Sequence, residues 1–428
     1  MVKFVRALSA ALAAVIVAGS FVGCGSKTSS NNAASSNDNT PVTITHWLWV
    51  DSADYMQTMN KIADDFHSKY PNITVKMQTY AYSDFSNTLT TALAGGGGPD
   101  TASFKLTWTP AYTQNNYLLA LDDAVDKWEG KSEILPMLWD KMKEAGGGKI
   151  YTMPWTWQVL YVYYRPSYFK AVGIDSVPKT FDEFIEDIKK CTTTINGKKV
   201  YGFGLRGASG GQEPWGSFIQ AYGGRFADEN NKVILNSPET VKGTQVFIDL
   251  YKNGYAPKTA VNDGLAELKT MFNNGQIAMF IHHIGSSVDM VKANGDDIDA
   301  FPVPKGPGGQ WTSMGDTENV VIASTKHQDA AIKWVEYLAS ADAVKKWDLA
   351  TGNLPVVSSV AEAAEFKDNK FMKVSMESQS YAGIFPILPT TANWVNNVWA
   401  PVMQQALMGK ISAEEAVKQL DAQLKGQA

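Results

Sequence analysis

Residues 42–79 change from the hydrophobic period of a strand to that of a helix and back again. Residues 42–49 are rich in β-branched and aromatic side chains, which favours a strand. Ser52 can then cap a helix, because the apolar residues after it recur at helical spacing. Pro71 ends that helix, and residues 73–79 predict a second strand.

The same alternation continues beyond residue 80. Ser83 begins a predicted helix that ends at the glycines of residues 95–98, and a third strand follows Pro99-Asp100. Strands and helices in alternation predict a parallel sheet with helices on both faces. The predicted fold class is therefore α/β.

A second alternating region begins at residues 161–164, which predict a strand. Capping signals at Thr180 and Ser237 begin two of its helices, and residues 304–315 predict a loop rich in glycine and proline. Further strands are expected at residues 200–205, 277–281, 299–303 and 319–324, and further helices at residues 328–339, 341–349, 394–408 and from Ser412 onward. The chain is too long for one ordinary core, so two domains are expected.

The first residues have the composition of an export signal. Lys3 and Arg6 precede an apolar stretch of about 16 residues, whereas a membrane-spanning helix needs about 20. We therefore expect residues 1–23 to be a signal peptide.

Cys24 directly follows this stretch, and Gly23 before it is small. The pattern resembles a bacterial lipobox, although Phe21 stands where leucine is usual. The resemblance implies that Cys24 carries a lipid; an ordinary signal peptide followed by a chance cysteine is the alternative. Residues 24–40 are rich in Ser, Asn, Ala and Asp, and we expect a disordered tether that holds the body near a membrane.

Composition disfavours several functional classes. Only 19% of the residues are charged and they form no basic cluster, which disfavours nucleic-acid binding. Adjacent His282 and His283 would face opposite sides of a strand, and metal-ligand spacings are absent from the sequence, so we expect neither metal nor cofactor. Residues 202–207 match G-x-G-x-x-G, but no helix follows at once, which indicates a chance match. Cys191 is expected to be a small buried hydrophobe.

Five short segments carry a resemblance to a known family. In chain order they are residues 70–75 (Tyr-Pro-Asn-Ile-Thr-Val), 97–100 (Gly-Gly-Pro-Asp), 148–154 (Gly-Lys-Ile-Tyr-Thr-Met-Pro), 272–279 (Phe-Asn-Asn-Gly-Gln-Ile-Ala-Met) and 302–306 (Pro-Val-Pro-Lys-Gly). Their order and spacing resemble the extracellular solute-binding proteins of the maltose-binding type, often called family 1. At Arg165-Pro166 the chain departs from the family's Asn-Lys.

The resemblance implies two α/β lobes around a ligand cleft, which is the type II fold of periplasmic binding proteins. Lobe I would comprise residues 41–153 and 318–352, and lobe II would comprise residues 154–317 and 353–428. Such proteins close on their ligand by a hinge motion and deliver it to an ABC importer. The resemblance thus implies a monomeric, extracytoplasmic binding protein rather than an enzyme, with the importer's permease as its partner.

Aromatic residues gather where the predicted strands end, and ligands of open α/β sheets bind at the carboxyl ends of strands. Flat tryptophan and tyrosine rings can stack on the apolar face of a sugar ring, so the expected ligand is a carbohydrate, in the form of an oligosaccharide. The aromatic candidates are Trp47, Trp49, Tyr82, Trp108, Trp155, Trp157, Trp215, Trp311 and Trp394.

Polar side chains near the same strand ends can pair with sugar hydroxyls. The polar candidates are Asp51, Lys105, Arg206, His283, Asp316 and Glu318. Lys105 and Arg206 would instead anchor an acidic ligand, so a binding protein for a non-sugar or acidic solute is one alternative. A lipid-anchored carbohydrate hydrolase is the other; it needs two carboxylates at a fixed separation, and no hydrolase motif accompanies the acids of this chain.

Overall fold

The computed structural model describes residues 40–50 and 52–427. The predicted signal peptide, Cys24 and nearly all of the predicted tether lie outside the described residues, as does Asp51. None of the described helices combines the length and the apolar character that crossing a bilayer requires.

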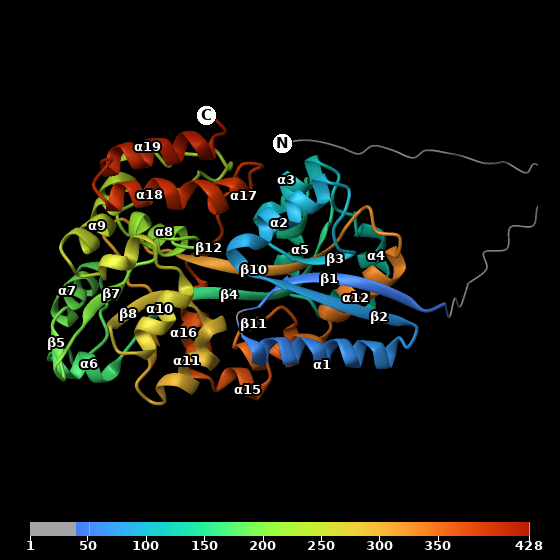
Figure 1. Cartoon of the computed structure of the whole chain (residues 1–428), viewed down its shortest axis with the longest axis horizontal. Helices are drawn as coiled ribbons and strands as arrows, with labels where there is room; N and C mark the ends of the chain where they lie inside the picture. The colour runs from blue at the N-terminus through green and yellow to red at the C-terminus, as the bar shows by residue number, and fades with distance from the viewer. Residues whose placement is uncertain (1–39, 51, 428) are drawn as a thin grey trace, which may run out of the picture. The chain divides into compact units, whose positions relative to one another are not determined.

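One ten-stranded sheet runs through the body (Figure 1). Its main path has the order β2-β1-β3-β10-β4-β8-β7, while β9 and β11 pair with β4 and β12 pairs with β10. The strands are β1 (Val42–Trp49), β2 (Ile73–Tyr80), β3 (Thr101–Phe104), β4 (Thr152–Tyr164), β7 (Tyr201–Gly204), β8 (Ile277–His283), β9 (Asp299–Phe301), β10 (Thr312–Val321), β11 (Leu354–Pro355) and β12 (Ala382–Gly383). A separate hairpin pairs β5 (Thr194–Ile195) with β6 (Lys198–Lys199).

This sheet is mixed. β1 runs parallel to β2 and β3, as the alternating pattern predicts, and β7 runs parallel to β8. In contrast, β10 is antiparallel to both β3 and β4, and β4 is antiparallel to β8. The prediction of a parallel sheet concerned the first three strands, β1 to β3, and it is confirmed for them. The antiparallel pairing of the central strands lies outside that prediction.

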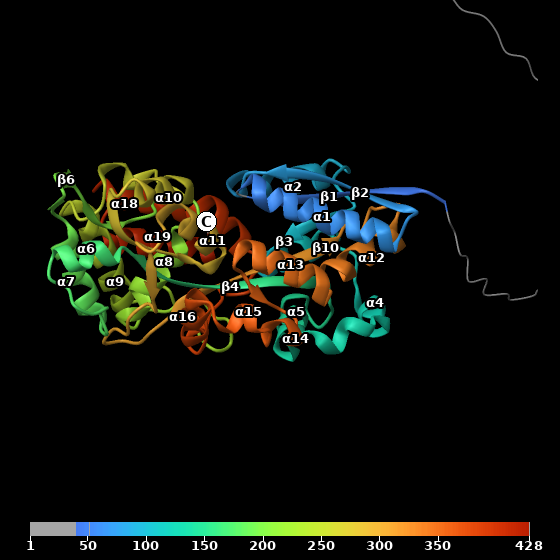
Figure 2. The same cartoon turned by 90° about the horizontal axis from the view of Figure 1, so that it is seen from below.

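The two longest strands, β4 and β10, pass through the whole body (Figures 1 and 2). β4 pairs with β10 through residues 152–159 and with β8 through residues 160–164. The pattern predicted only the last four residues of β4, residues 161–164, since Pro154 interrupts the apolar run of the strand. Pro154 lies where the β10 register shifts between Thr317 and Glu318, and a bulge tolerates the missing N–H. β10 likewise begins inside the segment predicted to be a loop.

Helices cover both faces of the sheet. They are α1 (Ala53–Lys69), α2 (Tyr82–Ala94), α3 (Thr109–Gln114), α4 (Asp122–Lys127), α5 (Pro136–Ala145), α6 (Pro166–Ala171), α7 (Phe181–Cys191), α8 (Gln212–Ala221), α9 (Pro238–Lys252), α10 (Leu265–Asn273), α11 (Ser287–Asn294), α12 (Gln328–Leu338), α13 (Ala341–Thr351), α14 (Ser358–Ala361), α15 (Ala364–Lys367), α16 (Lys370–Gln379), α17 (Thr391–Asn393), α18 (Trp399–Leu407) and α19 (Ala413–Leu424). Short 3₁₀ turns include η1 (Leu106–Trp108) and η4 (Ile284–Ser286), and η5 (Trp394–Val398) is a π turn.

The helix starts follow the predicted capping signals. The Ser52 side chain accepts a hydrogen bond from the Tyr55 backbone N–H, and Thr180 forms a full capping box with Glu183. Ser237 and Ser412 also accept hydrogen bonds from the first turns of α9 and α19. These four predictions are confirmed.

Figure 1 shows two groups of helices joined by β4 and β10. α1, α2, α5 and α12 surround β1, β2 and β3 at one end, and α6 to α9 surround β7 and β8 at the other. The last helices, α18 and α19, return to pack against α9 in the second group. Far-apart parts of the chain therefore meet in each group.

Side chains alternate across β4 between two hydrophobic cores. Trp155, Val159 and Tyr161 belong to one core, and Leu160 and Val162 belong to the other. Cys191 lies in the second core, where burial raises the pKa of its thiol to about 12. The cysteine is thus buried and protonated, as expected for a small hydrophobe.

Candidate ligand cleft

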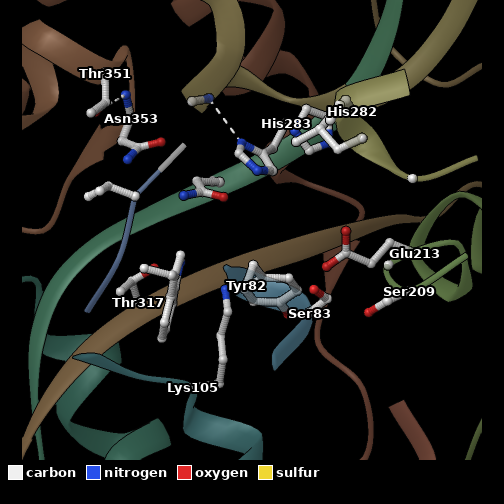
Figure 3. A pocket seen from close by; sticks show the side chains of 18 of the residues that line it. Tyr82, Ser83, Lys105, Ser209, Glu213, His282, His283, Thr317, Thr351 and Asn353 are labelled. Atoms are coloured by element: carbon white, nitrogen blue, oxygen red, sulfur yellow. Dashed lines mark hydrogen bonds between the residues drawn. The ribbon is translucent and has the colours of Figure 1, made fainter. Parts of the chain in front are cut away.

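A cavity of about 450 Å³ lies over the middle of β4, between the two groups of helices. Its size falls within the range of about 300–1,000 Å³ that is typical of small-molecule sites. Residues from β4, from the ends of β1, β3 and β8, and from α2, α8, α10 and α13 line it (Figure 3). The cavity joins residues that are more than 300 positions apart in the chain, such as Trp49 and Asn353.

One side of the cavity, here called the aromatic wall, consists of Trp49, Tyr55, Tyr82, Trp155 and Trp347. The Trp155 and Trp347 rings stack with centroids 4.6 Å apart, and Tyr55 meets Trp347 edge-on at 6.0 Å. Trp49 meets Tyr82 edge-on at 5.6 Å. Ring pairs at these separations are mutually attractive, so the wall presents several fixed flat surfaces.

Lys105 places a positive charge among these rings. Its Nζ lies 5.7 Å from the Trp49 ring centroid and 6.0 Å from the Tyr82 centroid, and it donates a hydrogen bond to the Asp316 carbonyl. Burial lowers the pKa of Lys105, but the negative charge of Asp316 and other neighbours outweighs it and the net direction is upward. The ammonium is therefore charged at neutral pH and is already held by its surroundings.

Asp316 and Glu318 lie behind Lys105 on β10. The Asp316 carboxylate accepts a hydrogen bond from the Leu106 N–H at 2.6 Å. Burial, followed by the negative charge of Asp316, raises the pKa of Glu318 well above its usual range. Neither acid lines the cavity, so the prediction that they contact the ligand directly is not supported by their position. They adjoin Lys105 because β10, which carries both acids, pairs with β3 and Lys105 directly follows β3.

The opposite side, here called the polar wall, consists of Arg206, Ser209, Glu213, Asn262, Glu267, His282 and His283. The loop after β7 wraps around Arg206, and a Cβ at Gly210 would lie 2.1 Å from the guanidinium carbon. Gly210 also has a φ of +88°, which favours glycine. The glycines of residues 207–211 thus shape a loop that holds an arginine at the cavity.

His282 and His283 both line the cavity, and their ring centroids lie 3.8 Å apart. The prediction that the two rings face opposite sides was wrong, because β8 ends at His283 and the chain turns into η4. His283 Nδ1 accepts a hydrogen bond from the Gly285 N–H at 3.0 Å (Figure 3). Burial, and then the charges of Lys105 and Arg206, lower the pKa of His283 well below its usual range. The ring is therefore neutral, and its Nε2 carries the hydrogen.

Glu213 lies in the first turn of α8, and its carboxylate points into the cavity (Figure 3). Burial raises the pKa of Glu213, although the positive charges of Arg206 and Lys105 oppose that effect. Gln158 reaches the cavity floor from β4, where a side chain at the facing Gly315 would crowd it at 3.3 Å. No group of three or more His, Cys, Asp or Glu side chains that could hold a metal occurs in residues 40–50 and 52–427.

The structure brings six of the predicted site residues together at this cavity: Trp49, Tyr82, Lys105, Trp155, Arg206 and His283. Three other predicted residues, Trp108, Trp215 and Trp394, are at most 1% exposed and are core residues. Their indoles pack within helices or turns, and Trp215 donates a hydrogen bond to Thr244 and Trp394 to Leu420. The assignment of these three to the ligand site is therefore corrected.

Three further tryptophans also lie away from the cavity lining. Trp47 packs against Tyr80 in a tilted arrangement, with ring centroids 4.8 Å apart, and lies two residues before Trp49 on β1. Trp157 donates its indole hydrogen bond to the Pro355 carbonyl, and Trp311 is buried against Phe226. Each of these three tryptophans was predicted to contact the ligand because of its aromatic ring and its place near a predicted strand end, but in the structure its ring packs against other residues.

Sequence reasoning missed several residues of the lining. Glu213 follows a glycine-rich loop, Trp347 has the position of an ordinary helix-core residue, and Asn353 follows a helix C-terminus. A signal was available for Glu213 alone, since it follows the glycine-rich loop after a predicted strand, and ligands of open α/β sheets bind beyond the carboxyl ends of strands. Whether Trp347 and Asn353 reach the cavity depends on which helix packs beside β4, and the sequence alone does not predict that packing.

Comparisons with known proteins agree with this geometry. The profile of the bacterial extracellular solute-binding protein family matches residues 49–345. The chain belongs to this family. Its curated relatives include the diacetylchitobiose-binding protein DasA of Streptomyces coelicolor, 24% identical over 397 residues that cover 89% of this chain and 88% of the relative. The maltodextrin-binding protein MdxE of Bacillus subtilis is 23% identical over 96% of this chain and 97% of the relative.

Among solved structures, an ABC transporter solute-binding protein from Thermotoga lettingae, bound with α-D-tagatose, aligns with a TM-score of 0.82. It is 25% identical to this chain, and the alignment covers 90% of this chain and 99% of that one. The solute-binding family and this likeness confirm the predicted α/β fold with two lobes around a cleft. The chain is an extracellular solute-binding protein of this type.

Proposed function

We propose that this solute-binding protein captures a carbohydrate in the cleft and delivers it to the permease of an ABC importer. The observation that carries the proposal is the pairing of the aromatic wall with the polar wall across one cavity. A sugar ring has an apolar C–H face and a rim of hydroxyls, so it can stack on one wall while it hydrogen-bonds to the other. Relatives named for diacetylchitobiose and for maltodextrin support an oligosaccharide as the ligand.

The capture cycle follows from the two-lobed architecture. We propose lobe I at residues 41–153 and 318–352 and lobe II at residues 154–317 and 353–428, with the hinge in β4 and β10. Ligand binding would favour the closed arrangement, which the permease would then recognise. We also propose that residues 1–23 are removed as a signal peptide, that a lipid on Cys24 anchors a monomer to the membrane, and that residues 24–40 serve as the tether.

The proposed function assigns no chemistry to the cleft. A carbohydrate hydrolase would need an acid and a second carboxylate on either side of the scissile bond. Among the described residues of the lining, the carboxylates are Glu213 and Glu267, and both belong to the polar wall. We therefore expect each ligand to leave the cleft chemically unchanged.

The test is a binding panel on residues 41–428, with neutral oligosaccharides, monosaccharides and polyols. A ligand at 100 times its Kd should raise the free energy of unfolding by about 2.7 kcal/mol, which thermal shift detects. Each ligand should be recovered intact by chromatography. Its consumption would instead indicate the hydrolase.

The chain offers a matched pair of variants for this panel. Trp49 and Trp47 are partly exposed side chains on the same face of β1, and Trp49 lines the cavity whereas Trp47 does not. Trp49→Ala should weaken sugar binding by about 2 kcal/mol, as for other buried aromatic anchors. Trp47→Ala should leave the affinity nearly unchanged. Equal affinities for both variants would contradict the placement of the site.

A further inference from the structure

Glu213 differs from the other charged groups around the cleft. Figure 3 shows its carboxylate directed into the cavity, toward the space between Tyr82 and His283. Within residues 40–50 and 52–427, no side chain or backbone N–H donates a hydrogen bond to it, and no cation lies within ion-pair distance. The carboxylate is partly exposed in the cleft, so it is open to accept hydrogen bonds from a ligand bound there.

The nearby cations are placed for other contacts. The Lys105 ammonium donates to the Asp316 carbonyl and adjoins the Trp49 and Tyr82 rings. The Arg206 guanidinium packs against Gly210 inside its loop. Each cation attracts Glu213 through space, but neither closes a hydrogen bond with it. The described lining residues thus include two cations, Lys105 and Arg206, and two carboxylates, Glu213 and Glu267. The Glu213 carboxylate keeps its acceptor capacity for a ligand.

We propose that Glu213 selects an uncharged saccharide by accepting hydrogen bonds from its hydroxyl groups, and that it rejects acidic sugars. This inference rests on the proposed function and narrows its substrate class. Hydrogen bonds from neutral hydroxyls to a carboxylate are charge-assisted, and one carboxylate can accept from two neighbouring hydroxyls. A ligand carboxylate in the same place would meet a like charge, which is unfavourable.

A purely structural role for Glu213 makes a different prediction. An acid in the first turn of a helix stabilises the N-terminus through the helix dipole. Glu239 holds the same position in α9, where it is exposed and lies outside the cleft. If the dipole explains Glu213, the variants Glu213→Gln and Glu239→Gln should lower thermal stability alike and leave ligand binding unaffected.

The experiment measures affinities by calorimetry on residues 41–428 and on both variants. The probes are glucose, galactose and mannose, and disaccharides of each, beside the corresponding uronates. The neutral member of a pair should bind at least about tenfold more tightly than its uronate, because a charge-assisted contact is replaced by repulsion. Glu213→Gln should weaken neutral binding by about tenfold or more and reduce that discrimination, whereas Glu239→Gln should change neither.

The outcomes separate the inference from the function beneath it. A uronate that binds more tightly than its neutral partner would overturn the selection by Glu213 and would leave saccharide capture intact. If the Glu213→Gln variant binds neutral saccharides as tightly as the parent protein, the selection by Glu213 would likewise be overturned while saccharide capture would stand. Absence of binding to every saccharide tested would contradict the proposed function itself.

Discussion

The aromatic wall and the polar wall are built in different ways. Trp155 and Trp347 stack on each other and belong to a hydrophobic core, so they help to hold the fold together. Glu213, Ser209 and His283 lie at a helix start, in a glycine-rich loop and at a strand end, each with part of its surface exposed. Substitutions in the aromatic wall should therefore affect stability and binding together, whereas those in the polar wall should affect binding with little change in stability.

The largest expected effect is on the aromatic wall. Trp155 is 2% exposed, and Trp155→Ala should lower the free energy of unfolding by about 3–5 kcal/mol because it leaves a cavity beside Trp347. Ser209→Ala, on the polar wall, should change it by less than about 0.5 kcal/mol. Urea denaturation measures both. A similar loss of unfolding free energy in the two variants would contradict the proposed difference between the two walls.

A second prediction concerns the acid behind the aromatic wall. Asp348 of α13 is fully buried and accepts a hydrogen bond from Thr156, and burial raises its pKa well above the usual range. Because the folded state holds this proton more tightly than the unfolded state, stability should fall as the pH rises from about 3.9 toward the raised pKa, by up to about 1.4 kcal/mol per pH unit. Asp348→Asn should flatten that slope. Parallel stability profiles for the variant and the parent protein would contradict the shift.

A third prediction divides the two roles of His283 on the polar wall. Asparagine caps helix starts well, so His283→Asn should keep the bond from the Gly285 N–H and change stability by less than about 1 kcal/mol. It removes the Nε2 hydrogen, and saccharide affinity should fall by about 0.5–1.5 kcal/mol in calorimetry. His283→Ala should lose the cap as well. An affinity that His283→Asn leaves intact would limit His283 to capping η4.

The smallest expected effect lies at a surface contact between α2 and η5. Asn87 of α2 and Asn397 of η5 exchange side-chain hydrogen bonds of 3.2 and 3.4 Å. Since both residues are exposed, Asn87→Ala should raise the ligand's dissociation rate by about twofold at most. Asn115, whose amide bonds to its own helix, provides the control. A much larger rate change would mean that this contact, rather than the walls, retains the ligand.

Local patterns in the sequence were sufficient for many elements. The strands at residues 42–49 and 73–79 and the caps at Ser52, Thr180, Ser237 and Ser412 follow from side-chain period and capping chemistry, which act within a few residues. The order of short motifs also indicated the family and its two-lobed fold. Only the end of the long strand β4, residues 161–164, was predicted, because Pro154 is tolerated by a bulge that a partner strand provides.

The sequence by itself therefore determined the class of fold, the helix starts and the abundance of aromatic residues suited to a sugar. The tertiary structure alone decided which of them face the ligand. Trp47 and Trp49 have the same side-chain type and lie on the same face of β1, yet Trp47 packs against Tyr80 and Trp49 lines the cleft. The hydrophobic period of a sequence predicts which side chains are buried, but it does not predict which residues they pack against. The cleft and the direction of Glu213 arise from contacts between segments far apart in the chain.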